Sequence, residues 1–180
     1  MSRTDDLIAA YRRHISLPWP RSAPGAARVI MVVYPPADER IIRLRVQELR
    51  LATEQSGHSW DLIDLTDLFA EWIGRHPHRE RYFARPQLLD NAALDRFVND
   101  LTETIAGVLR AHADDPGSVI TFAGCGGLYG FAHVSRLLHR IDNEIPGRVV
   151  VLFPGEKDDS NYRLLGARDG WNYMAVGITV

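Results

Sequence analysis

Apolar runs of strand length recur along the chain, and helical patterns separate them. The first run, residues 29–33, is continuously apolar rather than alternating, which is typical of a strand buried on both faces of a parallel sheet. Residues 60–65, 119–123 and 149–153 have similar length and predict the second, third and fourth strands. A final run, residues 173–178, predicts the last strand.

Between these runs, apolar residues recur three and four positions apart, which is the spacing of an amphipathic helix. The clearest helical pattern begins at Asp90 or Asn91, either of which can cap it, and keeps its period through residues 94–109. Shorter patterns predict further helices near residues 38–57, 66–73 and 131–141. Helices that alternate with apolar strands predict an α/β fold, a single layered domain with a largely parallel sheet of about five strands flanked by helices.

The start of the chain precedes this alternation. We therefore divide the sequence into an N-terminal helix with a proline-rich linker, residues 1–27, and the α/β domain, residues 28–180. Thr4 can cap the helix, and three prolines and a glycine within residues 17–27 predict the linker. The helix is a helical extension of the domain, either an appendage or a docking arm. Its apolar face is formed by Leu7, Ile8, Tyr11 and Ile15.

The segment after the fourth strand is less regular. The strand is predicted to end at Pro154, and a polar, acidic loop is expected after it. The turn dipeptide at residues 169–170 predicts that residues 162–167 pair with residues 171–176 as a hairpin. The competing prediction is a short helix over residues 160–165.

Composition narrows the class of protein. The 180 residues suit one domain, and 46% of them are hydrophobic, which is enough for one buried core. The formal net charge is −2, with 21 Lys and Arg against 23 Asp and Glu, so direct nucleic-acid binding is not expected. Cys125 is the single cysteine, which rules out an internal disulfide and a cysteine-rich zinc site and suits a reducing compartment. Without a secretory signal or a run of ~20 apolar residues, we expect a soluble cytoplasmic protein with no membrane partner.

One stretch, residues 74–89, is locally basic. It contains four arginines, together with His76 and His78 two positions apart. Because a convincing set of further ligands is absent from its surroundings, we predict no metal site there. The stretch is interpreted as a solvated loop or as a contact for an acidic partner.

The glycine-rich loop after the third strand is a candidate ligand loop. Gly124, Gly126, Gly127 and Gly130 could expose backbone N–H groups to a phosphate near the start of the next helix. The spacing is not that of a dinucleotide-binding motif, because Tyr129 occupies the place of the third glycine. The alternative is that these glycines only allow a tight turn and close packing. No Walker-type phosphate loop occurs in the sequence, and no cofactor is predicted.

No complete catalytic motif is present. Cys125 and His133 could form a nucleophile pair, but a lone cysteine among small residues at a packed turn is more often structural. Asp64 follows the second strand, where α/β folds place functional carboxylates, yet capping of the next helix also explains it. We therefore predict no enzymatic activity.

The last quarter of the chain concentrates aromatic rings, side-chain amides and an arginine. Tryptophan, tyrosine and arginine dominate the energetic centres of protein–protein interfaces. The segment is interpreted either as a partner-binding surface or as a rigid scaffold that closes the domain. The residues predicted to bind a partner are Asn161, Tyr162, Arg163, Asp169, Trp171, Asn172 and Tyr173.

These C-terminal motifs also carry a family resemblance. The motifs FPG, NYRLL and ARDGWNY follow a predicted strand, glycine-rich loop and helix with the sequence ITFAGCGGLYGFAHVSRLL. Together with the opening and SWDLIDLTDLFAEW blocks, they resemble the BrxB family of BREX bacteriophage-exclusion systems over residues 28–178. The matching positions are Pro154, Gly155, Asn161, Tyr162, Arg163, Asp169, Gly170, Trp171, Asn172 and Tyr173.

The resemblance implies a small, non-enzymatic component of a phage-defence gene island that associates with the phosphatase-fold subunit PglZ. It supplies no catalytic residues. The function predicted from it is an adaptor or scaffold that binds another BREX protein, most directly a PglZ-like subunit. The alternative is a small-molecule or nucleotide-binding α/β protein that uses the loop at residues 124–130.

Overall fold

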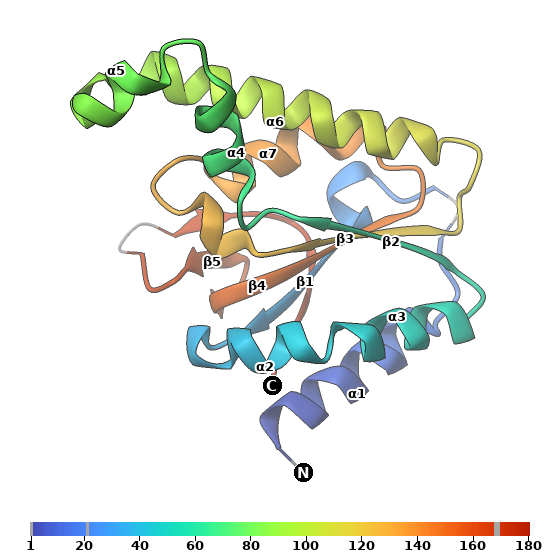
Figure 1. The fold of residues 1–180 in the computed structure, drawn as a ribbon. Helices are drawn as coiled ribbons and strands as arrows, with labels where there is room; N and C mark the ends of the chain where they lie inside the picture. The colour runs from blue at the N-terminus through green and yellow to red at the C-terminus, as the bar shows by residue number, and fades with distance from the viewer. Residues whose placement is uncertain (1, 21, 168–169) are drawn as a thin grey trace.

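A computed structural model of the chain describes residues 2–20, 22–167 and 170–180. At its centre is a parallel sheet with the strand order β2-β3-β4-β1-β7 (Figure 1). Its strands are β1 (Val29–Tyr34), β2 (Ser59–Asp64), β3 (Ser118–Ala123), β4 (Arg148–Asp158) and β7 (Val176–Ile178). The predicted strands therefore exist, and the predicted α/β fold class is confirmed.

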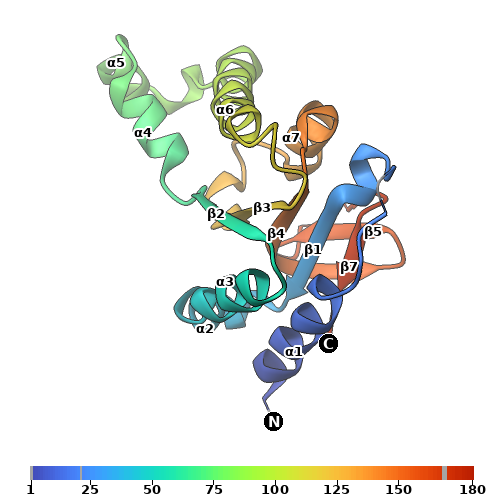
Figure 2. The ribbon, with the colours of Figure 1, turned by 90° about the vertical axis from the view of Figure 1, so that its right-hand side faces the viewer.

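Helices cover both faces of this sheet (Figure 2). One face carries α1 (Arg3–Ile15), α2 (Glu39–Leu44) and α3 (Val46–Gln55). The other carries α4 (Leu68–Arg75), α6 (Asn91–Ala111) and α7 (Val134–Ile141), and α5 (Arg79–Ala84) extends beyond the body. Single turns of 3₁₀-helix join several of these elements: η1 (Gly25–Arg28), η2 (Pro36–Asp38), η3 (Pro86–Leu88), η4 (Cys125–Leu128) and η5 (Asp142–Glu144).

The strand β1 shows how the sheet separates two hydrophobic cores. Val29, Met31 and Val33 point into the core on the α6 side, while Ile30 and Val32 point into the core on the α1 side. Because both faces are covered, every position of β1 is buried. This explains why the run is continuously apolar instead of alternating.

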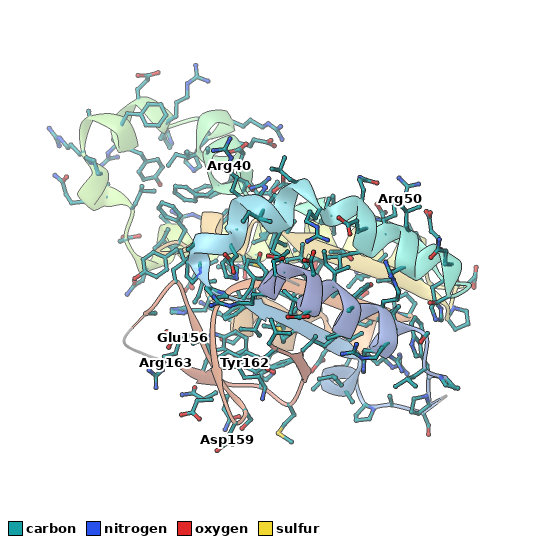
Figure 3. The ribbon with its side chains drawn as sticks, turned by 90° about the horizontal axis from the view of Figure 1, so that it is seen from below. Arg40, Arg50, Glu156, Asp159, Tyr162 and Arg163 are labelled. Atoms are coloured by element: carbon teal, nitrogen blue, oxygen red, sulfur yellow. The ribbon has the colours of Figure 1, made fainter. Side chains whose placement is uncertain are left out.

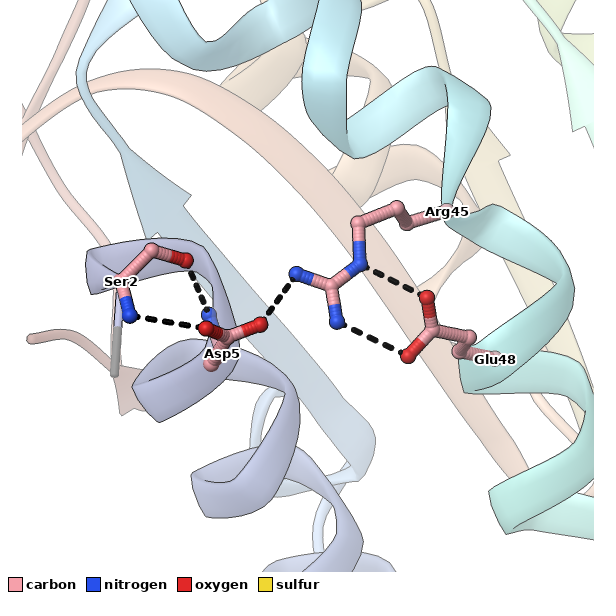
Figure 4. Close-up of polar contacts among 4 residues, drawn as sticks. All are labelled: Ser2, Asp5, Arg45 and Glu48. Atoms are coloured by element: carbon pink, nitrogen blue, oxygen red, sulfur yellow. Dashed lines mark hydrogen bonds and ion pairs between the residues drawn. The ribbon is translucent and has the colours of Figure 1, made fainter.

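The N-terminal helix begins earlier than predicted. The Ser2 hydroxyl accepts a hydrogen bond from the Asp5 N–H, and the Asp5 carboxylate accepts one from the Ser2 N–H at 2.7 Å (Figure 4). This capping box places Thr4 inside the helix, so the prediction that Thr4 caps it is wrong. A serine followed three positions later by an acid was the signal in the sequence.

The helix after β1 is interrupted at Arg45, which separates α2 from α3. The Arg45 guanidinium donates to the Asp5 carboxylate at 2.7 Å and to both oxygens of Glu48, at 2.7 and 2.9 Å (Figure 4). The interruption therefore coincides with a charged clamp between α1 and α3.

The C-terminal part of the chain forms a small antiparallel sheet that continues from the main one. The strand β4 runs past its predicted end at Pro154 as far as Asp158, and there pairs with β5 (Asn161–Leu164). β5 pairs in turn with β6 (Trp171–Asn172). The predicted antiparallel pairing is therefore confirmed in part, since it joins only residues 161–162 to residues 171–172 and not the whole of 162–167 to 171–176. The competing helix over residues 160–165 is wrong.

The polar loop expected after Pro154 is instead strand, because β4 changes neighbours there. Pro154 lies opposite Tyr34 of the parallel neighbour β1, and its carbonyl accepts a hydrogen bond from the Leu165 N–H at 3.0 Å. Gly155 begins the antiparallel part, where a side chain would collide with the carbonyl of Arg163. Proline and glycine, normally signals for a chain break, here mark a strand that passes from one partner to another.

Candidate functional site

A groove lies beside the loop that follows β3, at the carboxyl end of the parallel strands. Its volume is roughly 950 Å³. The walls come from the first turns of α6, from the segment that leads into α7, and from the chain between β5 and β6. Ligand sites in α/β folds commonly lie at this end of the strands, so we take the groove as the candidate functional site.

The groove has a mixed lining, in which apolar side chains lie beside polar ones and a paired Asp and Arg. Leu94 of α6, Leu164 of β5 and Trp171 of β6 contribute apolar surface from three elements. Arg136 of α7 donates a hydrogen bond to the Asp95 carboxylate of α6 at 2.6 Å, so the two charges offset each other. An apolar or aromatic group therefore fits the groove better than an ion.

Trp171 is held in place by an aromatic cluster. Its ring lies 5.8 Å from that of Phe153, 5.2 Å from that of Tyr162 and 6.0 Å from that of Tyr173, measured between centroids. These spacings are those of favourable aromatic pairs. Trp171 itself is half-buried and reaches the groove, so it presents a rigid aromatic surface there.

The other predicted partner-binding residues do not share one face. Tyr162 and Tyr173 are buried, and burial raises the pKa of both phenols, that of Tyr173 to about 12. Arg163 lies opposite Glu156 on the β4–β5 hairpin, where both side chains can be followed in Figure 3. Asn161 is half-buried and Asn172 exposed, whereas Asp169 lies outside the described residues.

The glycine-rich loop is a packing turn. Gly124 has a φ of 72°, and a side chain there would collide with Thr66 and Asp64. Gly127 approaches the Thr66 backbone as closely, and its own N–H donates to the Gly124 carbonyl at 2.9 Å. The Tyr129 N–H is likewise used, by the Gly126 carbonyl at 3.1 Å. These geometries support the interpretation that Gly124 and Gly127 provide close packing, whereas a side chain at Gly126 would meet only ordinary contacts with Leu165 and Gly130 borders the groove.

Cys125 lies within this turn and is completely buried. Desolvation, followed by the charge of Glu39, raises the pKa of its thiol far above the ordinary value. A cysteine reacts as its thiolate, so this environment opposes a nucleophilic role with His133.

Asp64 has a local structural task at the end of β2. Its Oδ1 accepts hydrogen bonds from the backbone N–H and the hydroxyl of Thr66, and its Oδ2 pairs with the Arg43 guanidinium at 2.6 Å. Partial burial raises the pKa of this carboxyl, but the bonds from Thr66 and the charge of Arg43 outweigh it and hold the pKa below its usual value. The carboxylate thus shapes the turn before α4.

The basic stretch is more ordered than predicted, since it contains the end of α4, the helix α5 and the turn η3. The His76 Nδ1 accepts a hydrogen bond from the His78 N–H at 3.1 Å, so the two histidines order a turn. Within residues 2–20, 22–167 and 170–180, no group of three or more His, Cys, Asp or Glu side chains is arranged to hold a metal ion.

The α6 wall of the groove could not be found from the sequence. The helical period assigns Leu94 to a buried face, and nothing in it shows that this part of α6 faces the C-terminal segment. Tyr129, which lines the groove from the glycine-rich loop, is 51% exposed, and this exposure is visible only in the structure.

Comparisons with known proteins identify no relative. No protein-family model, no curated protein and no solved structure matches the chain. Among the helices that the structure describes, none is long and apolar enough to cross a membrane.

Proposed function

We propose that this protein is a non-catalytic adaptor of a BREX-type anti-phage system, which binds a PglZ-like subunit in the cytoplasm. The resemblance of the C-terminal motifs to the BrxB family motivates the proposal. The observation that carries it is the position of Trp171: the tryptophan of the most distinctive motif borders a groove and is only partly buried.

The physical properties of this groove suit a protein partner. A tryptophan fixed by neighbouring rings loses little conformational freedom on binding, and such residues dominate interface energies. Leu94 and Tyr129 extend the apolar surface around it. Asp95 and Arg136 are paired with each other, so an apolar anchor beside them would not leave either charge without a partner. The partner is therefore expected to insert an aliphatic or aromatic side chain between α6 and β6.

The test is a binding measurement between the purified protein and a purified PglZ-like subunit of a BREX system. We expect Trp171→Ala to weaken binding at least tenfold, since interface tryptophans commonly contribute more than about 1.4 kcal/mol. Leu44→Ala is the matched control, because Leu44 is 76% exposed and lies on α2, across the sheet from the groove. If Trp171→Ala retains its circular dichroism spectrum and binds like the control, the groove is not the interface.

A second candidate function rests on the size of the groove. Its roughly 950 Å³ lies within the range of small-molecule sites, which favours a bound metabolite or nucleotide. Thermal unfolding with a panel of nucleotides separates the two functions, since a ligand at 100 times its Kd stabilises the folded state by about 2.7 kcal/mol. An unchanged Tm at millimolar nucleotide would exclude nucleotide binding.

A further inference from the structure

The opposite, amino-terminal end of the sheet holds an arginine whose charge has no acidic partner. Arg148 is the first residue of β4 and is only 7% exposed. Its Nη1 donates to the Gly147 carbonyl at 2.9 Å, and no carboxylate of the described residues lies within 4 Å of the guanidinium. A guanidinium has five N–H donors, so most of its hydrogen-bonding capacity is unused by the protein.

A tryptophan from the linker lies over this arginine. The guanidinium carbon of Arg148 is 4.6 Å from the ring centroid of Trp19, and Trp19 also stacks on His58 at 3.8 Å with nearly parallel rings. The Trp19 Nε1–H is buried and has no hydrogen-bond acceptor among the residues described. An unused indole donor and an unused guanidinium are therefore adjacent.

A second arginine and a histidine lie near this pair. Arg28 lies just before β1, the neighbour of β4, and it donates to the carbonyls of Ala23 at 2.9 Å and Ile145 at 2.7 Å. Desolvation lowers the pKa of Arg148, and the charge of Arg28 lowers it further. Burial is also the main cause that lowers the pKa of His14.

The acidic residue that influences this region is already engaged. The charge of Asp115 raises the pKa of His58, although burial lowers it more. The two carboxylate oxygens of Asp115 already accept hydrogen bonds, one from the Ser59 hydroxyl and one from the Gly117 N–H. The two arginines are therefore close together without a compensating carboxylate. The unbonded nitrogens of Arg148, unlike the Trp19 Nε1, are not buried without a partner, so an oxyanion from solvent can reach them. Its charged hydrogen bonds would add to the cation–π contact with Trp19.

We propose that this cluster, formed by Arg148, Arg28, Trp19 and His58, binds a small oxyanion, a phosphate or a carboxylate group. The unused guanidinium N–H groups of Arg148 would donate to two of its oxygens, as arginine does toward planar or tetrahedral oxyanions. The Trp19 Nε1–H would supply a neutral donor from the side. Trp19 lies in the linker, outside any helix or strand. Its side chain could therefore shift to admit the anion while the strands of the sheet stay in place. This site is separate from the groove and does not depend on the adaptor function.

Calorimetric titration of the full-length protein with inorganic phosphate tests the proposal, and titration with acetate distinguishes a phosphate site from a carboxylate site. Chloride at matched ionic strength is the reference, because phosphate also stabilises proteins nonspecifically. We expect saturable binding of at least one of the two anions, weakened tenfold or more in Arg148→Met. Arg140→Met is the matched control: this exposed arginine donates to Asn99 on the α6 side of the sheet, and its loss should leave the Kd unchanged.

Trp19→Phe keeps the test decisive if Arg148→Met does not fold. The phenylalanine ring preserves stacking but removes the indole donor, so anion binding should weaken several-fold while the thermal transition remains cooperative. Absence of saturable binding by either anion overturns the proposal. Equal affinity of wild type and a folded Arg148→Met variant overturns it as well.

Discussion

At the scale of single residues, Asp5 has the most connected side chain of the N-terminal helix. Its carboxylate closes the capping box with Ser2 and reaches across to Arg45, which also binds Glu48. The hydrogen bond from the Ser2 backbone, and then that from Arg45, lowers the pKa of the Asp5 carboxyl from 3.8 to about 2. The capping box can be predicted from the spacing of Ser2 and Asp5 in the sequence. The clamp to Arg45 is not, because it depends on how α1 lies against α3.

This pKa predicts an acid-dependent loss of stability. A carboxyl whose pKa is lower in the folded than in the unfolded chain stabilises the fold above the unfolded pKa, and this contribution disappears as the pH falls from about 4 to about 2. We expect Asp5→Asn to unfold at lower urea than wild type at pH 6 and at nearly the same urea near pH 2. Urea titrations at several pH values measure this. A difference that stays constant across the range would show that the charge of Asp5 has no part in stability.

At the scale of elements, β2 is an edge strand whose exposed backbone is partly protected. The Leu65 N–H donates to the Ala123 carbonyl of β3, so strand alternation turns the Leu62 N–H toward the open edge. The Asp61 carboxylate accepts that N–H at 2.8 Å and adds a charge beside the exposed Leu62 side chain. Charged side chains at sheet edges oppose pairing with a second chain.

Removing this protection should promote self-association. We expect Asp61→Ala to remain folded, because its contact with His112 is partly exposed and such pairs contribute less than about 1 kcal/mol. Its freed edge should then shift the protein toward dimers or larger species as concentration rises, measured by sedimentation velocity. Asp67→Ala is the control, since it removes the same charge from an exposed position outside β2. Identical sedimentation of the two variants would show that Asp61 does not guard the edge.

The elements that the sequence predicts best are those whose pattern is set by local burial. The apolar run of β1 and the long period of α6 reflect continuous contact with a core, so length and period suffice to predict them. The second half of β4 could not be predicted, because residues 156–158 are polar and become strand only by pairing with β5. The groove is likewise a property of packing: its walls are distant in sequence, and no motif connects Leu94 with Trp171.

At the scale of the whole molecule, α1 covers the core on the α1 side of the sheet. A buried pair of hydroxyl groups, from Tyr11 and Thr53, holds α1 in place. The Thr53 hydroxyl donates its hydrogen to the Leu49 carbonyl at 2.8 Å. The Tyr11 hydroxyl is therefore the donor in the 2.6 Å hydrogen bond between the two side chains. The same face buries three aliphatic side chains in the core that α1 shares with α3 and β7: Leu7, Ile8 and Ile15. The linker suggests that residues 1–27 are separable from the α/β domain. Whether they are depends on how much α1 contributes to the stability of the domain, and this can be tested.

We expect a variant without residues 1–16 to lose cooperative unfolding. Full burial of one large apolar side chain contributes roughly 1.5–3 kcal/mol, and α1 buries four of them, which is comparable to the 5–15 kcal/mol that stabilises a typical domain. Urea denaturation followed by circular dichroism, together with binding of a hydrophobic dye, measures the effect. Arg12→Ala with Arg13→Ala, on the exposed side of the same helix, should change little. A shortened chain with the wild-type midpoint would make residues 1–27 a separable unit.

The strand order has a consequence during synthesis. β1 is synthesised before both of its neighbours in the sheet, β4 and β7, and Val149, the partner of Val29, follows it about 120 residues later. At translation rates of roughly 5–20 residues per second, the nascent chain carries this unpaired apolar strand for on the order of 10 s. Throughout that interval its most hydrophobic segment is open to chaperones and to neighbouring nascent chains.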